Sequence, residues 1–166
     1  MGDNYPYFRN VRQWERVSQK WSPKPWIFIL AVIFLLLFIA LAFAQEVNLD
    51  IIIAIESNWR AEAVNRHSQA TGLGQITPIA LKDFNQLNGT HYTMADLKDP
   101  QRNMRISYWT LTERIPQLLR HFKKAVTVDH ILWVYNSGIG NLVRGIKPRE
   151  TVAYIKHYKE MSRCVF

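Results

Sequence analysis

Hydrophobic residues are spread very unevenly along the 166-residue chain. Residues 26–44 read WIFILAVIFLLLFIALAFA, a run of 19 residues without a charge, a glycine or a proline. As a helix this run would be about 29 Å long, close to the thickness of a bilayer core. A buried core helix would need a domain that surrounds it on every side, and only about 120 residues follow it. The run therefore predicts a transmembrane helix.

A basic leader, residues 1–25, precedes this run with five basic and two acidic residues, a net charge of +3. The positive-inside rule places such a leader in the cytoplasm and the rest of the chain outside. Ala42-Phe43-Ala44 resembles a signal-peptidase site, but the apolar run exceeds the roughly 7 to 15 residues of a signal peptide. We therefore expect a retained signal-anchor in the inner membrane, with residues 45–166 forming one periplasmic domain.

Beyond residue 45, apolar and polar positions follow helical spacing. The stretch DIIIAIESNW, residues 50–59, predicts a helix with Asn48 or Asp50 near its cap. Thr77, Asp99 and Thr127 are each expected to cap a further helix.

The other boundaries of the domain follow from glycine, proline and the absence of periodicity. Gly89 is expected to end the first of these three helices and Pro116 to kink or restart the second. A last amphipathic helix should follow Pro148, with Val152, Ile155 and Tyr158 on one stripe. Residues 60–77 lack sustained periodicity and predict an irregular or hairpin stretch, so the domain is expected to be mainly α, with little sheet.

Charge and cysteine content narrow the choice of partners. Residues 45–166 carry 16 basic and 11 acidic residues, a net charge of +5 scattered along the chain. The charges form no aromatic-interleaved run, so nucleic acid is not expected as a partner, whereas an anionic polymer or lipid surface is. Cys164 is the single cysteine and the five histidines lack metal-binding spacing, so no metal or cofactor is predicted.

Glu56 is the residue that most suggests chemistry. Its neighbours within one helical turn include Ile52, Ile53 and Trp59, so this side of the helix is expected to be buried. Burial would raise the pKa of the carboxyl toward neutrality and make it a candidate general acid. The alternative is an ordinary surface ion pair with Arg60 one turn later, and spacing alone leaves both readings open.

Several short motifs follow Glu56 in a fixed order. They are ES-x-W at 56–59, Ala63, GLGQI-x-P at 72–78, DPxxN at 99–103, VYNSGIGN at 134–141 and ET-xx-Y at 150–154. Over residues 47–160 this set resembles the lytic transglycosylases of the soluble-lytic-transglycosylase (SLT) type, relatives of goose-type lysozyme. The resemblance implies an α+β lysozyme-like domain that acts on peptidoglycan glycan strands.

The resemblance also implies roles for individual residues. Glu56 would be the sole catalytic acid and base, with Ser57 as a supporting hydroxyl. The other residues expected at the sugar cleft are Gln75, Tyr135, Asn136, Glu150, Thr151 and Tyr154, with the Tyr135 hydroxyl near the Glu56 carboxyl. Each has an ordinary structural alternative, such as a turn residue for Gln75 or a core aromatic for Tyr135.

The sequence departs from the pattern of the family in two places. The usual Gly-Leu-Met-Gln is Gly72-Leu73-Gly74-Gln75 here, and with Ala70 two residues before Gly72 the usual Gly-Ala-x-Gly is incomplete as well. Ser107 stands where the family often has glycine. The loss of the methionine is expected to remove a bulky wall of the cleft beside Gln75.

The implied reaction needs no second carboxylate. Ordinary glycosidases use two, whereas substrate assistance is an exception. Asp50 and Glu62 lie six residues on either side of Glu56, off its face if the helix reaches that far. The family mechanism implies cleavage between N-acetylmuramic acid (MurNAc) and N-acetylglucosamine (GlcNAc), with a 1,6-anhydromuramoyl end.

Two other functions stay open at this point. One is a hydrolytic muramidase. The other is a non-catalytic, membrane-tethered glycan-binding component of an envelope-spanning secretion complex or a virion. An enzyme anchored in the lipid bilayer would reach only nearby glycan, which fits local wall opening for secretion, conjugation or phage genome entry.

Overall fold

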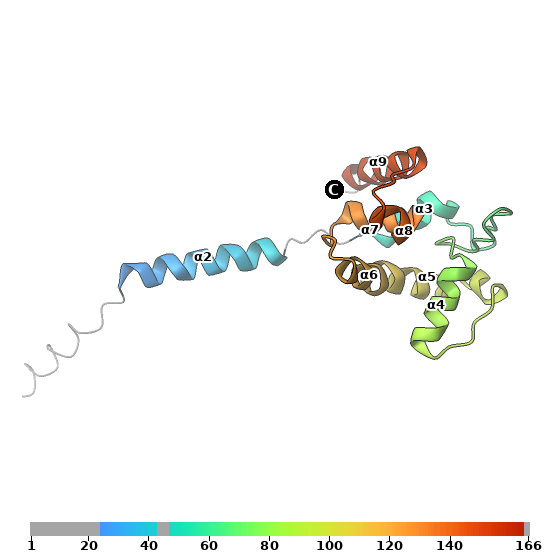
Figure 1. Cartoon of the computed structure of the whole chain (residues 1–166), viewed down its shortest axis with the longest axis horizontal. Helices are drawn as coiled ribbons and strands as arrows, with labels where there is room; N and C mark the ends of the chain where they lie inside the picture. Colours follow the sequence, from blue (N-terminus) through green and yellow to red (C-terminus); the bar gives the residue numbers. More distant parts are fainter. Residues whose placement is uncertain (1–23, 43–46, 165–166) are drawn as a thin grey trace, which may run out of the picture. The chain divides into compact units, whose positions relative to one another are not determined.

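The computed structural model describes residues 24–42 and 47–164 (Figure 1). The chain divides into two compact units, Met1–Ala44 and Gln45–Phe166. The first unit contains α2 (Pro25–Ala42), a helix of 18 residues. Among the described residues, no helix combines the length and the apolar character needed to cross a membrane. Residues 1–23 of the predicted leader and residues 43–44 of the predicted transmembrane run lie outside the described residues.

The second unit is helical in the residues that the structure describes. Its elements, in chain order, are α3 (Leu49–Ser57), α4 (Pro78–Asn88), the 3-10 helix η1 (Ala95–Lys98), α5 (Pro100–Trp109), the π-helical segment η2 (Thr110–Arg114), α6 (Ile115–His121), α7 (Val128–Ser137), α8 (Ile139–Val143) and α9 (Arg149–Cys164). Figure 1 shows α4 and α9 at opposite edges of this unit. No β-strand occurs in residues 47–164, where the only pairing is a pair of isolated antiparallel bridges, Val64 with Thr71 and Thr71 with Ile76.

The predicted helix caps are confirmed. The Asn48 side chain accepts a hydrogen bond from the Asp50 N–H at the start of α3. Thr77, Asp99 and Thr127 likewise cap α4, α5 and α7, and each accepts a hydrogen bond from a backbone N–H of the first turn. These bonds satisfy N–H groups that have no partner within the helix, so the sequence fixes where each helix begins.

The predicted end of α4 and the restart at Pro116 are confirmed as well. Gly89 ends α4 in the left-handed conformation, with φ of 63°. α5 does not continue straight to Pro116; it passes through the π-helical η2, and α6 then begins with Pro116 in its first turn. A proline there has no N–H to leave unpaired, so the helix resumes at little cost.

Two hydrophobic clusters make up the core. The large core joins α3, η2, α6, α7, α8 and α9; its central side chains include Ile52, Leu119 and Leu132, all fully buried. The small core joins α4, η1 and α5 through Phe84, Leu97 and Ile106. α5 and η2 form one continuous helical run that supplies residues to both clusters, so it couples them.

The predicted stripe on α9 is wrong at one position. Ile155 and Tyr158 are buried as expected, but Val152 is 50% exposed and Thr151 is fully buried in its place. Residues 151, 155 and 158 follow the spacing of three and four residues that keeps side chains on one helix face. The polar Thr151 is accommodated because its hydroxyl donates a hydrogen bond to Asn136 Oδ1 over 2.7 Å.

Candidate active site

Glu56 lies in the last turn of α3, a helix fixed at its start by a contact with α9 and ended sharply by its backbone angles. At the start of the helix, the Asn48 N–H donates to the Tyr158 hydroxyl over 2.7 Å, which ties α3 to α9. At its end, Ser57 is the last helical residue, and Asn58 and Trp59 both have positive φ, at 50° and 62°. Such angles are uncommon outside glycine, so the chain leaves the helix sharply just after Glu56.

This sharp exit corrects the expectation for Trp59. The sequence predicts Trp59 on the buried side of a longer helix, but the side chain is 52% exposed because the helix ends two residues before it. Ile52 and Ile53, by contrast, are fully buried as predicted. The alternative ion pair of Glu56 with Arg60 does not form among the described residues; the Arg60 Nε–H donates to the Ser57 carbonyl over 3.1 Å.

The Glu56 carboxyl lies partly buried against α9. The Tyr154 hydroxyl donates a hydrogen bond to Glu56 Oε1 over 2.8 Å. Burial raises the pKa of Glu56 from its usual 4.5 to about 7, and the Tyr154 hydrogen bond offsets part of this rise because it favours the carboxylate. A carboxyl with this pKa is divided between its acid and base forms near neutral pH and can therefore serve in either role.

A tight turn at residues 71–76 forms the neighbouring part of the site. The fully buried Asn103 on α5 organises it: its side-chain NH₂ donates to the Thr71 and Leu97 carbonyls, both at 2.9 Å. Asn103 Oδ1 accepts from the Gly74 N–H at 2.7 Å. Asn103 is the last residue of the DPxxN motif, so this motif serves to hold the turn. The sequence points to Asn103 through the motif but not to this role.

Gly74 sits where no side chain fits. A Cβ added there would lie 2.0 Å from Ser107 Oγ and 2.9 Å from the Tyr135 hydroxyl. The Tyr135 hydroxyl in turn donates to the Gly74 carbonyl over 2.7 Å. The expectation that Gly74 removes a wall of the cleft is therefore corrected. Position 74 faces α5 and α7, and Ser107, which stands where the family often has glycine, occupies the space in front of it.

Tyr135 lies close to Glu56 without a direct hydrogen bond to it in the described structure. Burial raises the pKa of Tyr135 well above its usual range, and the Glu56 charge raises it further. The pKa of Tyr154 is likewise raised, first by burial and then by the Glu56 charge. Both phenols thus remain protonated, so they act near Glu56 as hydrogen-bond donors.

A cavity of about 520 Å³ opens beside Glu56. It is lined by Glu56, Arg60, Glu62, Ala63, Val64, Asn65 and Gln75. The Gln75 amide donates to the Ala63 and Gly72 carbonyls, at 3.2 Å and 2.9 Å, and joins the two sides of the cavity. The volume falls within the range of small-molecule sites, about 300 to 1,000 Å³.

Glu62 belongs to this cavity, which the sequence did not predict. The argument that Glu62 lies off the face of Glu56 assumed a helix that continues to it, whereas α3 ends at Ser57. The Glu62 side chain is 73% exposed and pairs with Lys98 at 3.0 Å. A second carboxylate therefore borders the cavity, in a far more solvated setting than Glu56.

The remaining predicted site residues lie behind or away from the cavity. Ser57 is buried, and its hydroxyl donates to the Ile53 carbonyl over 3.2 Å. Asn136 accepts the Thr151 hydroxyl and so links the end of α7 to the start of α9. Glu150 is exposed in the first turn of α9. None of these three lines the cavity at Glu56, and their functional roles stay predictions.

The site contains the elements of acid–base chemistry. In residues 24–42 and 47–164, no three His, Cys, Asp or Glu side chains lie close enough together to hold a metal ion. A helical domain with one partly buried carboxyl of raised pKa, two phenols behind it and a cavity in front of it is the arrangement of a lysozyme-like glycosidase.

Comparison with known proteins identifies the family. The model of the transglycosylase SLT domain matches residues 43–158, more than half of the chain. The chain therefore belongs to this family and is a peptidoglycan lytic transglycosylase, an enzyme that cleaves glycosidic bonds by a lyase-type reaction. No curated protein and no solved structure gave a significant match.

Proposed function

We propose that Glu56 is the sole catalytic acid and base of this enzyme and that it cleaves the β-1,4 bond between MurNAc and GlcNAc. The observation that carries the proposal is the Glu56 carboxyl itself, partly buried at the edge of the 520 Å³ cavity, with its pKa raised to about 7. No other carboxyl that lines this cavity is partly buried, since Glu62 is largely exposed.

The reaction proceeds in two proton transfers. Protonated Glu56 donates its proton to the glycosidic oxygen, the bond from that oxygen to the muramoyl C1 breaks, and GlcNAc leaves as an alcohol. The acetamido group of the substrate stabilises the cationic C1 in the meantime. The Glu56 carboxylate then takes the proton of the muramoyl C6 hydroxyl as its oxygen bonds to C1. A 1,6-anhydromuramoyl end results, and Glu56 is protonated again.

The neighbours of Glu56 support both halves of this cycle. Burial favours the protonated form that the first step needs, while the Tyr154 hydrogen bond favours the carboxylate that the second step needs. Ring closure wins over hydrolysis only where water is kept from C1. The space that a side chain at position 74 would need is filled by Ser107 and Tyr135, which supports a closed wall behind the reacting sugar.

Product analysis tests the proposal. The full-length protein should release muropeptides with anhydro ends from purified sacculi, identified by mass spectrometry, and Glu56→Gln should release none. Glu160→Gln removes a carboxylate from the exposed end of α9 and should leave the product yield unchanged. An active Glu56→Gln protein would exclude Glu56 as the sole acid and base.

Hydrolysis is a second candidate outcome, because Glu62 borders the same cavity. In a two-carboxylate mechanism Glu62 would serve as the base that activates water. The same digest separates the two reactions, since hydrolysis leaves reducing muramic acid ends in place of anhydro ends.

We further propose that residues 26–44 anchor the enzyme in the inner membrane, with the basic leader in the cytoplasm and the catalytic domain in the periplasm. The uncharged 19-residue run and the +3 leader support this. Large apolar side chains of α2, among them Trp26, Phe28 and Phe34, are also exposed. A stably anchored enzyme would open peptidoglycan only close to the membrane, as a secretion, conjugation or virion complex requires.

The single cysteine makes the orientation measurable. Cys164 is exposed at the end of α9, so a membrane-impermeant maleimide should label it in cells whose outer membrane is permeabilised and whose inner membrane is intact. Labelling only after the inner membrane is disrupted, or recovery of the protein in the soluble fraction, would contradict the proposed anchor.

A further inference from the structure

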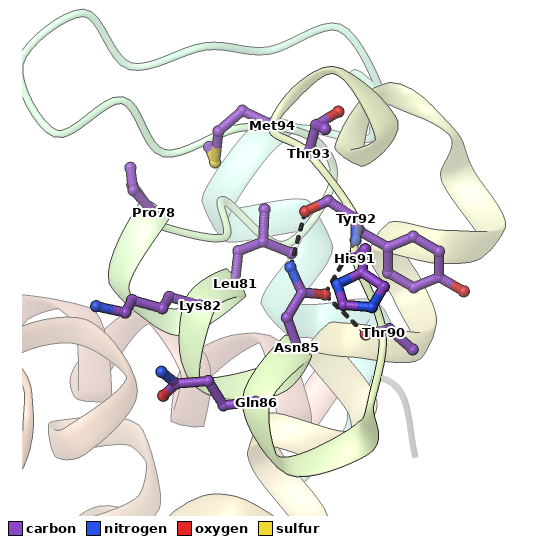
Figure 2. Close-up of a pocket in the computed structure, with 10 residues that line it drawn as sticks. All are labelled: Pro78, Leu81, Lys82, Asn85, Gln86, Thr90, His91, Tyr92, Thr93 and Met94. Carbon is purple, nitrogen blue, oxygen red and sulfur yellow. Dashed lines mark hydrogen bonds between the residues drawn. The ribbon is translucent and has the colours of Figure 1, made fainter.

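A second cavity, of about 420 Å³, lies away from Glu56 between α4 and the extended segment that follows it. Figure 2 shows its two sides. One side is a single face of α4, formed by Pro78, Leu81, Lys82, Asn85 and Gln86, and the other is the segment 90–94. We call this cavity the α4 pocket. It shares no lining residue with the cavity at Glu56.

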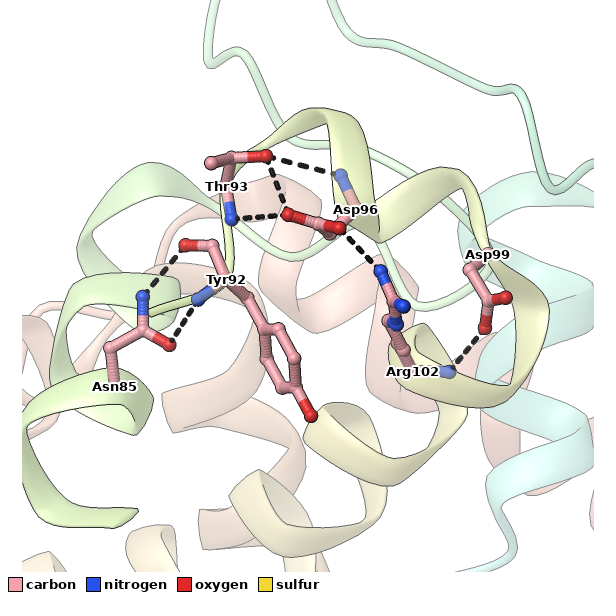
Figure 3. A network of polar contacts seen from close by, with 6 residues as sticks. All are labelled: Asn85, Tyr92, Thr93, Asp96, Asp99 and Arg102. Atoms are coloured by element: carbon pink, nitrogen blue, oxygen red, sulfur yellow. Dashed lines mark hydrogen bonds and ion pairs between the residues drawn. The ribbon is translucent and has the colours of Figure 1, made fainter. Parts of the chain in front are cut away.

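The wall opposite α4 is rigid because Asn85 and Asp96 hold it. The Asn85 side chain donates to the Tyr92 carbonyl at 2.8 Å and accepts from the Thr90 hydroxyl at 2.7 Å and the Tyr92 N–H at 3.1 Å. Asp96 accepts from the N–H and the hydroxyl of Thr93, and it also pairs with Arg102 (Figure 3). A pocket whose wall is already ordered loses little conformational freedom when a ligand binds.

Segment 90–94 leaves main-chain groups free that suit a peptide. Between the bonded residues Thr90 and Tyr92, the N–H and C=O of His91 have no hydrogen bond within the described part of the chain. A peptide that runs along segment 90–94 can pair with both groups, as in strand addition. The buried Leu81 and the partly buried Met94 give the pocket an apolar floor for alkyl side chains.

The pocket offers no phenyl, phenol or indole face on which a sugar ring could stack. Besides the imidazole of His91, its only aromatic ring is that of Tyr92, and Figure 2 shows the Tyr92 ring turned away from Leu81. The Arg102 guanidinium lies over that ring instead, with its Cζ 5.5 Å from the ring centroid, and Phe84 stacks beside the ring. The lining therefore favours a peptide over a saccharide.

Charge selects among peptides. Lys82 and His91 line the pocket together with no Asp or Glu. The nearest acids along the chain are occupied, since Asp83 pairs with Arg114 and Asp96 with Arg102. Lys82 has no ion pair among the described residues, so its ammonium group is free to bind a carboxylate.

The substrate carries such a peptide. In peptidoglycan, a short stem peptide is attached to the lactyl group of each muramic acid. These peptides carry free carboxylates. Gln75 lines the cavity at Glu56 and Pro78 lines the α4 pocket. Only two residues lie between them in the chain, so their Cα atoms are at most about 11 Å apart. A glycan bound at Glu56 thus brings its own stem peptide within reach, at a high effective concentration.

We propose that the α4 pocket binds the carboxylate-bearing stem peptide of peptidoglycan, with Lys82 holding a carboxylate and the His91 main chain pairing with the peptide backbone. The inference rests on the proposed function, because the peptide belongs to the glycan cleaved at Glu56. The pocket makes the enzyme prefer strands that still carry peptides over strands from which amidases have removed them.

Binding to the ¹⁵N-labelled full-length protein tests this site without turnover. A synthetic stem tripeptide with a free C-terminal carboxylate should shift the amide resonances of Gln86 and His91. Lys82→Gln should weaken this binding about fivefold to tenfold, because one charge-assisted hydrogen bond is lost. Lys156→Gln, which removes the same charge from an exposed site on α9, is the matched control and should bind as the native chain does.

Cleavage then separates this inference from the proposed function. Lys82→Gln should raise KM about fivefold to tenfold on peptide-bearing strands and leave kcat and KM unchanged on amidase-treated, peptide-free strands. No resonance shift at Gln86 and His91, or an equal weakening by both lysine variants, would overturn the site. Peptide binding with no cleavage of either substrate would refute the proposed function and leave the peptide site standing.

Discussion

The cavity at Glu56 has two sides that differ in how they are built. The inner wall is the Glu56 carboxyl with Tyr135 and Tyr154 packed behind it. It is held by hydrogen bonds between residues far apart in the chain, such as Tyr154 to Glu56 and Tyr135 to Gly74. The outer rim, formed by Arg60, Glu62 and Asn65, is exposed. Two of its contacts are local: Arg60 binds the Ser57 carbonyl, and Asn65 accepts from the His67 N–H.

The two carboxylates of the cavity show what this difference does. On the inner wall Glu56 loses hydration, so its pKa rises to about 7. On the outer rim Glu62 keeps most of its solvent contact and has Lys98 as a partner. Two identical functional groups therefore have different chemical capacities, and the packing behind each one decides which can act as an acid. The predictions below test the inner wall first and the outer rim last.

The largest effect is expected at Gly74, where the packing behind the inner wall leaves no space for a side chain. Gly74→Ala places a Cβ 2.0 Å from Ser107 Oγ and 2.9 Å from the Tyr135 hydroxyl, so both must move. We expect a loss of about 1 to 3 kcal/mol in the free energy of unfolding, and a fall of at least about tenfold in turnover, since a displacement near 1 Å is costly at a reacting centre. Thermal unfolding and sacculus digestion measure the two effects.

A second substitution should restore what Gly74→Ala removes. Ser107→Gly frees the space that the new Cβ needs, so Gly74→Ala with Ser107→Gly should be more stable than Gly74→Ala alone, with a coupling of about 1 to 2 kcal/mol. Gly140→Ala is the matched control, because a Cβ there meets nothing within 4 Å. If Gly74→Ala were as well tolerated as Gly140→Ala, the inner wall would not be close-packed.

The next effect, on stability alone and not on turnover, is in how stability depends on pH. The pKa of Glu56 is about 7 in the folded protein and 4.5 in its usual state, so between these values the folded chain binds a proton that the unfolded chain has lost. Stability contributed by Glu56 therefore falls as pH rises from 4.5 to 7 and is level above that. The total is about 3 kcal/mol. Glu56→Gln should remove this slope.

The measurement is the difference in unfolding free energy between Glu56→Gln and the native chain, from urea titrations at several pH values. This difference should shift by about 3 kcal/mol in favour of the variant between pH 4.5 and pH 8. Tyr154→Phe sharpens the test, because it removes a hydrogen bond that lowers the Glu56 pKa and should extend the slope to higher pH. A difference that stays constant with pH would mean that Glu56 is not desolvated by the inner wall.

The contrast between wall and rim also explains what the sequence could predict. Caps at Asn48, Thr77, Asp99 and Thr127 depend on residues within a few positions, and they were predicted correctly. Glu56 could be singled out because its apolar neighbours Ile52 and Ile53 lie in the same helix. Local patterns are thus sufficient wherever the cause itself is local.

Other features depend on causes that no local pattern carries. The left-handed angles of Asn58 and Trp59 end α3 early, and this one event both exposes Trp59 and brings Glu62 to the cavity. The bond from Tyr154 to Glu56 joins residues 98 positions apart. The apolar pattern predicts Val152 and not Thr151 on the buried stripe of α9, because the partner that satisfies the Thr151 hydroxyl, Asn136, lies on another helix. Ser107 occupies the space that a side chain at position 74 would need. Only the 2.0 Å distance from a Cβ at that position to Ser107 Oγ makes this apparent.

The smallest effect is expected on the outer rim. Glu62 is 73% exposed, and its pair with Lys98 should contribute under about 1 kcal/mol, as surface ion pairs do. If Glu56 alone moves the protons, Glu62→Gln should change kcat/KM on sacculi by no more than about twofold, with anhydro ends still formed. Lys98→Gln removes the other half of the pair and should have the same slight effect.

A loss of about 100-fold in Glu62→Gln alone, on the scale of a missing general base, would instead make Glu62 a second catalytic carboxylate. Both sides of the cavity would then take part in the reaction. They would differ in which step each carboxyl serves, Glu56 as the acid and Glu62 as the base, and not in whether they are catalytic.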